Sequence, residues 1–198
     1  MALHAPEPVA PLGRRFLAFF LDGFLLAPAY AVYAVVLDAF LGPLVGPDPA
    51  GTGLVVVAVD PLRVALELSL TLLTDAAYFA GCWTRWGMTA GQRACGVAVR
   101  AVGPGEEPPG GGQRLLPRDP ERVPARVAMV RWALLQVVPL CLGSLGASGA
   151  VPLEVVGAGN GAWYGLLLVT ALADPLRRGL HDRMVGTVVV RAAIARQA

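Results

Sequence analysis

Two acidic side chains lie inside apolar stretches of the chain, where a charge is costly. Asp22 stands in the apolar run 16–41, seven residues after Arg15, so a helix would place both on one face, about 10 Å apart. Asp75 lies in a second apolar stretch, about 15 Å from Arg85 if that stretch is helical. Because two acids in one low-dielectric site do not both ionise easily, one would bind a proton or the pair would hold a cation.

Two interpretations of these acids stay open. In the first, Asp22 and Asp75 meet in the inner half of a membrane and bind a small cation or proton, with Arg15 tuning them. In the second, the two acids are independent and each is satisfied by a neighbour, such as Arg15 or a helix hydroxyl for Asp22. In both, Asp22 must face other helices or a wet cavity, because lipid offers no hydrogen bonds.

Residue types that would support catalysis or metal binding are sparse. The three cysteines are scattered, and no Ser or Cys has a plausible His partner. One of the two histidines, His4, lies near the N-terminus, and the other, His181, precedes Asp182 among arginines, which favours a salt-bridged turn. We expect no enzyme, no cofactor and no metal site.

The composition indicates a membrane protein. The 198 residues are 56% hydrophobic and 15% charged, against about 25% charged in ordinary soluble domains. In 16–41, fourteen Leu, Phe and Val residues each favour insertion by about 0.3–0.6 kcal/mol, which outweighs the roughly 2.5–3.5 kcal/mol cost of Asp22. The sequence predicts an all-α fold with four transmembrane helices, at about 16–40, 62–84, 131–147 and 154–173.

The arginines set the predicted topology. Segment 42–61 has no basic residue, whereas 84–131 has eight arginines and five more follow Ala173. The positive-inside rule therefore places the loop 85–130 and both termini in the cytoplasm, in the inner or plasma membrane of the cell. The arginine-rich segment 118–131 is expected to form a basic helix that binds anionic lipid headgroups. It has no aromatic platform for nucleic acid.

Short strands are expected outside the spans. Segment 95–102 alternates as a strand would, and 188–191 could pair with it below the membrane to form a small cytoplasmic cap. Segment 54–59 is either a strand or the lead into the second helix. We expect a disordered tail over 1–13 and a second tail over 192–198.

A small-residue face is predicted in the fourth span. Gly157, Gly161 and Gly165 recur every four residues, a spacing that lets another helix approach closely. The neighbouring helix belongs either to this chain or to a second copy. Because four helices are few for a complete transport path, a homo-oligomer is expected.

Three separated motifs resemble one family. The segments RRFLAFFLD, WGMTAGQRACGVAVRAV and ADPLRRGLHDRMVGTVVV are similar to the RDD family of small, mainly bacterial membrane proteins, named for an arginine and two aspartates. The resemblance implies an RDD-type domain over 14–191. It implies that Arg15 and Asp22 are the first Arg and Asp, and that Asp182, or alternatively Asp174, is the second Asp.

The family's loop motif is matched by Gly87, Thr89, Gly91, Arg93 and Gly96, with Gln92 where Lys is frequent. We interpret it as a sharp turn after the second helix, in which Gly91 and Gly96 supply backbone freedom. The resemblance implies little about activity beyond transport, including sodium/proton exchange, suggested for some members. Two functions are therefore expected: exchange of a small cation or proton through membrane-embedded carboxylates, or a non-transporting scaffold or accessory subunit.

Overall fold

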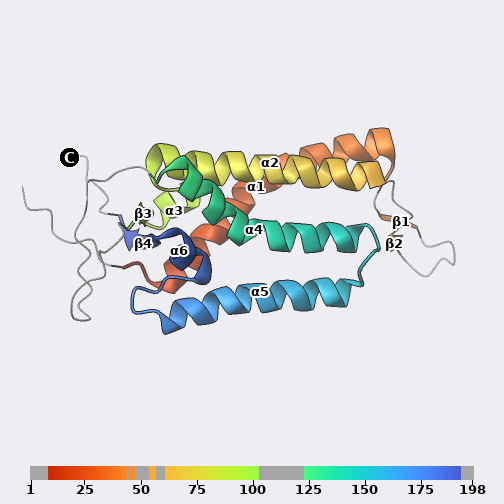
Figure 1. Ribbon diagram of the computed structural model, residues 1–198. Helices are drawn as coiled ribbons and strands as arrows, with labels where there is room; N and C mark the ends of the chain where they lie inside the picture. Colours follow the sequence, from red (N-terminus) through yellow and green to blue (C-terminus); the bar gives the residue numbers. More distant parts are fainter. Residues whose placement is uncertain (1–8, 44, 48–53, 57–60, 103–122, 193–198) are drawn as a thin grey trace, which may run out of the picture.

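Four long helices form the body of the protein (Figure 1). The computed structural model describes residues 9–43, 45–47, 54–56, 61–102 and 123–192. Each long helix is long and apolar enough to cross a membrane, as the sequence predicts. They are α1 (Leu12–Leu41), α2 (Pro61–Trp86), α4 (Ala125–Ala147) and α5 (Leu153–Ala173).

Four short elements gather at one end of the bundle and are called the cap here (Figure 1). They are α3 (Ala90–Ala94), β3 (Val97–Ala101), α6 (Leu180–Val185) and β4 (Thr187–Arg191). Strands β3 and β4 pair antiparallel, from Val97 opposite Arg191 to Ala101 opposite Thr187, which confirms the predicted pairing. Val97 and Val99 of β3 and Val189 of β4 are buried in one cluster with side chains of the long helices, so this face of the sheet shares the core of the bundle. Val188 and Val190 of β4 are buried in a second, smaller cluster with Ala98.

The N-terminal boundary differs from the expected tail over 1–13. Val9 bridges Val190 of β4, Ala10 is fully buried and donates its N–H to the Val189 carbonyl, and α1 already begins at Leu12. The described chain is therefore packed from residue 9 onward. The prediction missed this because the Pro-rich stretch lacks periodicity, while an edge strand in the cap supplies its hydrogen bonds.

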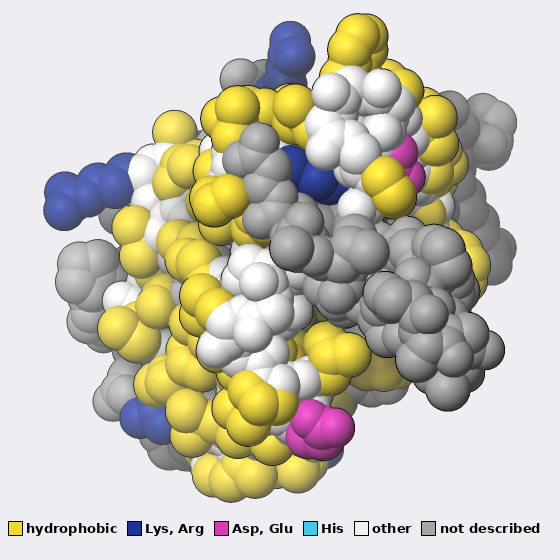
Figure 2. Space-filling view, turned by 90° about the vertical axis from the view of Figure 1, so that its right-hand side faces the viewer, with side chains coloured by type: hydrophobic (Ala, Val, Ile, Leu, Met, Phe, Trp, Pro, Cys, Tyr) yellow, Lys and Arg dark blue, Asp and Glu magenta, His cyan; other side chains and the backbone are white. Residues whose placement is uncertain are grey.

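At the opposite end, a hairpin joins α1 to α2. Strands β1 (Val45–Pro47) and β2 (Leu54–Val56) pair antiparallel, so the described part of 54–59 is a strand. The buried Arg63 of α2 binds Asp38 and the Gly42 carbonyl at the end of α1, which ties the two helices together. Figure 2 looks onto this end, where hydrophobic side chains predominate among the described residues.

The start of α4 corrects one prediction. The helix begins at Ala125, six residues before the predicted span at 131, so Arg126 and Arg131 belong to α4. Arg131 is only 3% exposed, and it does not lie on a lipid-facing surface helix. The rest of the predicted basic helix, up to residue 122, lies outside the described residues.

Candidate functional site

Asp22 of α1 is held by three donors. It is 1% exposed and accepts from the Tyr78 hydroxyl at 2.6 Å, the Thr89 hydroxyl at 2.6 Å and the Gly91 backbone N–H at 2.7 Å. Tyr78 comes from α2, and the other two come from the first turn of α3. The three donors supply hydrogen bonds to both carboxylate oxygens, and no salt bridge to Asp22 is found among the described residues.

The loop motif builds this contact. Thr89 is the N-cap of α3 in a capping box, and the side-chain oxygen of Gln92 accepts a hydrogen bond from the Thr89 N–H at 2.9 Å. The same oxygen accepts from the Trp83 indole at 3.0 Å. Gln92 thereby fixes α3 against α2.

Gly91 is needed for space, and the predicted need for backbone freedom is wrong at this position. Gly91 lies in α3, and a Cβ there would clash with the Ala18 carbonyl and lie 2.7 Å from Oδ1 of Asp22. Gly87 and Gly96, with φ of 68° and 64°, do adopt left-handed backbone, as expected for the turn at Gly96. Arg93 of the same motif is exposed.

Asp182 is the centre of a second cluster. It is 1% exposed and accepts from Nε of Arg131 and from the Thr187 hydroxyl, both at 2.8 Å. Arg15 lies 3.9 Å from it, and the Arg131 guanidinium also stacks on Trp83 at 4.3 Å. The cluster therefore connects α1, α2, α4, α6 and β4.

The prediction that Arg15 neutralises Asp22 is wrong. Arg15 donates to the carbonyls of Ala10 and Val189, both at 3.1 Å, and to that of Arg177 at 2.5 Å, beside Asp182. Arg15 and Asp22 both lie on α1, as their spacing predicts, but each side chain has nearer partners from other segments of the chain. The structure instead supports the alternative in which Asp22 is satisfied by hydroxyls.

Burial and charge shape the titration of the α6 residues. Burial raises the pKa of Asp182, but the charge of Arg131 and the hydrogen bonds from Thr187 and Arg131 more than offset this, so that its pKa lies below the usual range. Burial lowers the pKa of His181 to about 4, and His181 is neutral at pH 7. Its Nε2 lies 3.4 Å from Oδ2 of Asp182. Because the ring is neutral, the salt bridges of Asp182 are made with Arg131 and Arg15 instead.

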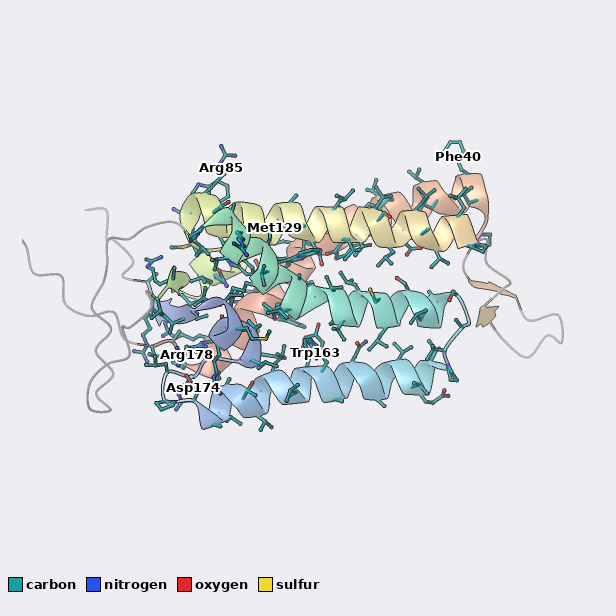
Figure 3. The ribbon with its side chains drawn as sticks, in the orientation of Figure 1. Phe40, Arg85, Met129, Trp163, Asp174 and Arg178 are labelled. Atoms are coloured by element: carbon teal, nitrogen blue, oxygen red, sulfur yellow. The ribbon has the colours of Figure 1, made fainter. Side chains whose placement is uncertain are left out.

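Asp174, the alternative second aspartate, has a local role. It accepts from the Arg178 side chain at 3.1 Å and from the N–H groups of Leu176 and Arg178 at 3.0 Å (Figure 3). Burial raises its pKa, but the hydrogen bonds from Arg178 outweigh that effect and lower it. Asp174 closes one turn after α5, whereas Asp182 joins distant segments.

Asp75 has a different environment. It is 3% exposed and accepts a hydrogen bond from the Tyr30 hydroxyl of α1. Asp75 lies about 21 Å from the start of α2 and about 17 Å from its end, near the middle of the helix. Within the described ranges, no cation contacts it and no cluster of three His, Cys, Asp or Glu side chains exists. Asp22 and Asp75 thus have separate donors.

The predicted glycine face does not mediate close packing within the described chain. A Cβ at Gly157, Gly161 or Gly165 would meet nothing within 4 Å. Helices α4 and α5 instead approach at Gly146 and Gly159, where a Cβ would lie 2.8 Å from Val156 and 3.0 Å from Leu142. The four-residue repeat carries no information on which face of the helix turns toward this chain, and packing of these glycines against a second copy stays a prediction.

Sequence reasoning also missed Tyr30, Tyr78 and Arg131. The two tyrosines are polar side chains inside apolar spans, so each needs a partner, and that signal could have identified them. The basic neighbours of Arg131 favour a surface helix, which hides its buried role. Each partner lies on a different element from the acid it binds, and spacing along a single helix does not reveal such pairs.

Comparison with known proteins identifies a family. The model of the RDD family matches residues 9–186, which is most of the chain. No curated protein and no solved structure is detectably similar to it.

Proposed function

Because the chain belongs to the RDD family and is a multi-pass membrane protein, we propose that it exchanges protons, or a small cation, across the membrane at Asp75. The observation that carries the proposal is a buried carboxyl near the middle of α2 that has a tyrosine hydroxyl and no cationic partner in the described chain. Such a group is stable when it binds a proton or a small cation.

The proposal assigns the acids different roles. Asp22 accepts from three donors over both of its oxygens, and Asp182 is held by Arg131 and Thr187, so both have less capacity than Asp75 to bind and release an ion. Asp75 has only the Tyr30 bond, which leaves its second oxygen available. Exchange through one carboxyl favours the proton over a metal ion, because metal cations of this size need several oxygen ligands.

A flux assay tests the proposal. Wild-type protein and Asp75→Asn are reconstituted in liposomes that enclose a pH-sensitive dye, and proton movement is followed after a pH or sodium gradient is applied. We expect Asp75→Asn to reduce flux to that of empty liposomes while its thermal midpoint stays near wild type, since Asn still accepts from Tyr30. Wild-type flux in this variant would refute the role of Asp75.

Glu67→Gln is the matched control. Glu67 lies two turns earlier on α2, its side chain is 32% exposed, and it is 3.9 Å from Arg63. The substitution removes an acid from the same helix without touching the Tyr30 contact. We expect it to retain wild-type flux.

The proposed orientation places the cap in the cytoplasm of a cell membrane, with both termini there. It is supported by the contrast between 42–61, which has no arginine, and 84–131, which has eight. Exposed arginines of the cap, such as Arg93, would then face anionic headgroups. Cysteine labelling at position 93 from either side of intact membranes tests this.

A second candidate function is a scaffold or accessory subunit that transports nothing. It is favoured by the way the family residues Arg15, Asp22 and Asp182 fasten the cap to the helices. The exposed face with Gly157 and Gly161 would then bind a second copy or another membrane protein. If wild type gives no flux and crosslinking captures a stable oligomer through this face, the scaffold is the better description.

A further inference from the structure

A cavity of about 200 Å³ lies between α2 and α4, in the half of the bundle that is nearer the hairpin. Its lining includes Glu67 and Thr71 of α2 and Pro139 and Ser144 of α4. The hydroxyls of Thr71 and Ser144 have no hydrogen-bond partner among the described residues, and neither residue is fully buried. Because a water molecule takes up about 30 Å³ in the liquid and needs polar partners, the cavity has both the room and the groups to hold several waters.

The two cavity hydroxyls differ from other hydroxyls of the long helices. Those of Thr84 and Thr170 each donate to a carbonyl one turn earlier in their own helix. A hydroxyl without such a bond loses free energy inside a membrane, so Thr71 and Ser144 need water or another polar partner. Among the described residues, no hydrogen bond or ion pair joins the α2 side of the cavity to its α4 side. The two helices are therefore free to separate here.

The cavity approaches Asp75 from the hairpin side and stops one turn short of it. Thr71 lies four residues before Asp75 on α2, on the same face of the helix. Asp75 itself does not line the cavity and is 3% exposed. Glu67 lies one turn nearer the hairpin, where Gln would keep the size and polarity of the lining. For water to reach Asp75 from this side, α4 must move away from α2.

Pro139 divides α4 at the level of the cavity. Proline has no N–H, so the carbonyl one turn earlier loses its helical hydrogen bond, and sharp kinks in helices arise at such positions. The part of α4 before Pro139 is fixed, because the buried Arg131 binds Asp182 at 2.8 Å. In the part after it, residues 140–147, only Gly146 is buried. The helix is therefore anchored on one side of its weak point and loosely packed on the other.

The second part of α4 is bound to α5 instead. A Cβ at Gly146 would lie 2.8 Å from Val156, and one at Gly159 would lie 3.0 Å from Leu142, so the two helices are in close contact. In Figure 1, α4 starts next to α2, and its later turns run beside α5. Residues 140–160 therefore form one unit, which we call the α4–α5 arm.

We infer that the α4–α5 arm turns about Pro139 as a gate, which extends the water of the cavity to Asp75 and connects this carboxyl with the hairpin side of the membrane. The role of the gate rests on the proposed proton exchange at Asp75, whereas its movement does not. A change in kink of about 20° over residues 140–147, about 12 Å of helix, displaces the end of α4 by about 4 Å. This displacement exceeds the diameter of a water molecule.

Cysteine labelling tests the aqueous path. A membrane-impermeant, cationic methanethiosulfonate is added to the full-length protein in lipid nanodiscs. The chain carries alanine in place of its three native cysteines, Cys82, Cys95 and Cys141. Thr71→Cys is the probe, because Thr71 lines the cavity. Leu73→Cys is the matched control, since Leu73 lies only two residues further along α2 but is 68% exposed on the lipid-facing surface of this membrane-spanning helix.

We expect Thr71→Cys to react at least about tenfold faster than Leu73→Cys, because only a hydrated thiol ionises to the reactive thiolate. Pro139→Ala restores a continuous helix and should slow the reaction of Thr71→Cys about fivefold, since the reagent is larger than water and enters only when the gate is open. Pro28→Ala, which removes the proline of α1, should leave this rate unchanged.

Distances between spin labels test the movement. The first pair of labels is attached at Leu66 of α2 and Leu145 of α4, which are both exposed, so the labels do not disturb the packing. The control pair, at Arg85 and Met129, joins the same two helices at the cap end (Figure 3). We expect two distances that differ by about 4 Å for the first pair and one distance for the control pair. Pro139→Ala should reduce the first pair to one distance.

Equal reaction rates for Thr71→Cys and Leu73→Cys would refute the aqueous path, and equal rates with and without Pro139 would refute the hinge. Neither measurement requires transport, so their outcomes are separate from those of the flux assay. The expected labelling and distances in a protein without flux would support the gate and refute exchange at Asp75. Flux that depends on Asp75, together with a single distance for the first pair, would support the exchange and refute the gate.

Discussion

Gly91→Ala should weaken the contact between α3 and α1. The added Cβ would lie 2.3 Å from the Ala18 carbonyl oxygen and 2.7 Å from Oδ1 of Asp22, whereas ordinary contacts begin at 3.4 Å, so α3 must retreat by about 1.1 Å. That shift lengthens the bonds that Asp22 accepts from Thr89 and Gly91, now 2.6 and 2.7 Å. Each bond to a carboxylate contributes about 1.5–3 kcal/mol, and the better helix propensity of Ala returns up to about 1 kcal/mol.

The net loss is about 2–5 kcal/mol, which lowers the thermal midpoint by roughly 4–20 °C for a protein of this size. The assay is thermal unfolding in detergent, with hydrogen exchange over 90–94 as a local readout. Gly81→Ala is the control, because a Cβ at Gly81 of α2 meets nothing within 4 Å. Equal midpoints and equal exchange for the two variants would refute the spatial role of Gly91.

Two further predictions concern α6. Asp182→Asn should destabilise the protein by about 3–5 kcal/mol, because Arg131 is left as a buried charge, whereas Asp174→Asn should cost less, and thermal unfolding of both variants checks the order. The pKa of His181 falls from 6.5 to about 4 on folding, so the unfolded state binds more protons between these values, and stability decreases as the pH falls through this window. Unfolding at pH 5 should therefore require about 2 kcal/mol less than at pH 7.5, and His181→Gln should remove most of that difference; a flat profile for wild type would contradict the buried neutral histidine.

The spans and the strand pairing could be predicted because each depends on local pattern. Apolar length predicts the four helices, and alternation over 95–102 predicts the strand Val97–Ala101, with which the segment 188–191 pairs. The start of α4 could not be predicted in the same way. Arg131 reads as a surface charge in sequence, and it is buried only because α6 brings Asp182 to it from fifty-one residues away.

The partners of the two family acids show where sequence reasoning ends. Spacing along α1 makes Arg15 a candidate partner for Asp22, but spacing contains no information about α3 and α6, which enter from other parts of the chain. The loop motif did contain the necessary residues, Thr89 and Gly91. Their role as donors to Asp22 depends on contact over nearly seventy residues, which no local rule supplies.

The positions of these contacts limit where the protein can move. Asp22 binds α1 to α2 and α3, and Asp182 binds α4 and α6 to the cap strands, so the cap end is held from two sides. Arg63 fixes α1 to α2 at the hairpin end. The Asp75–Tyr30 bond lies between these two anchors, so a change in its protonation would act on the middle of the α1 and α2 pair. Helix α5 has no such buried ion pair along its length in the described chain.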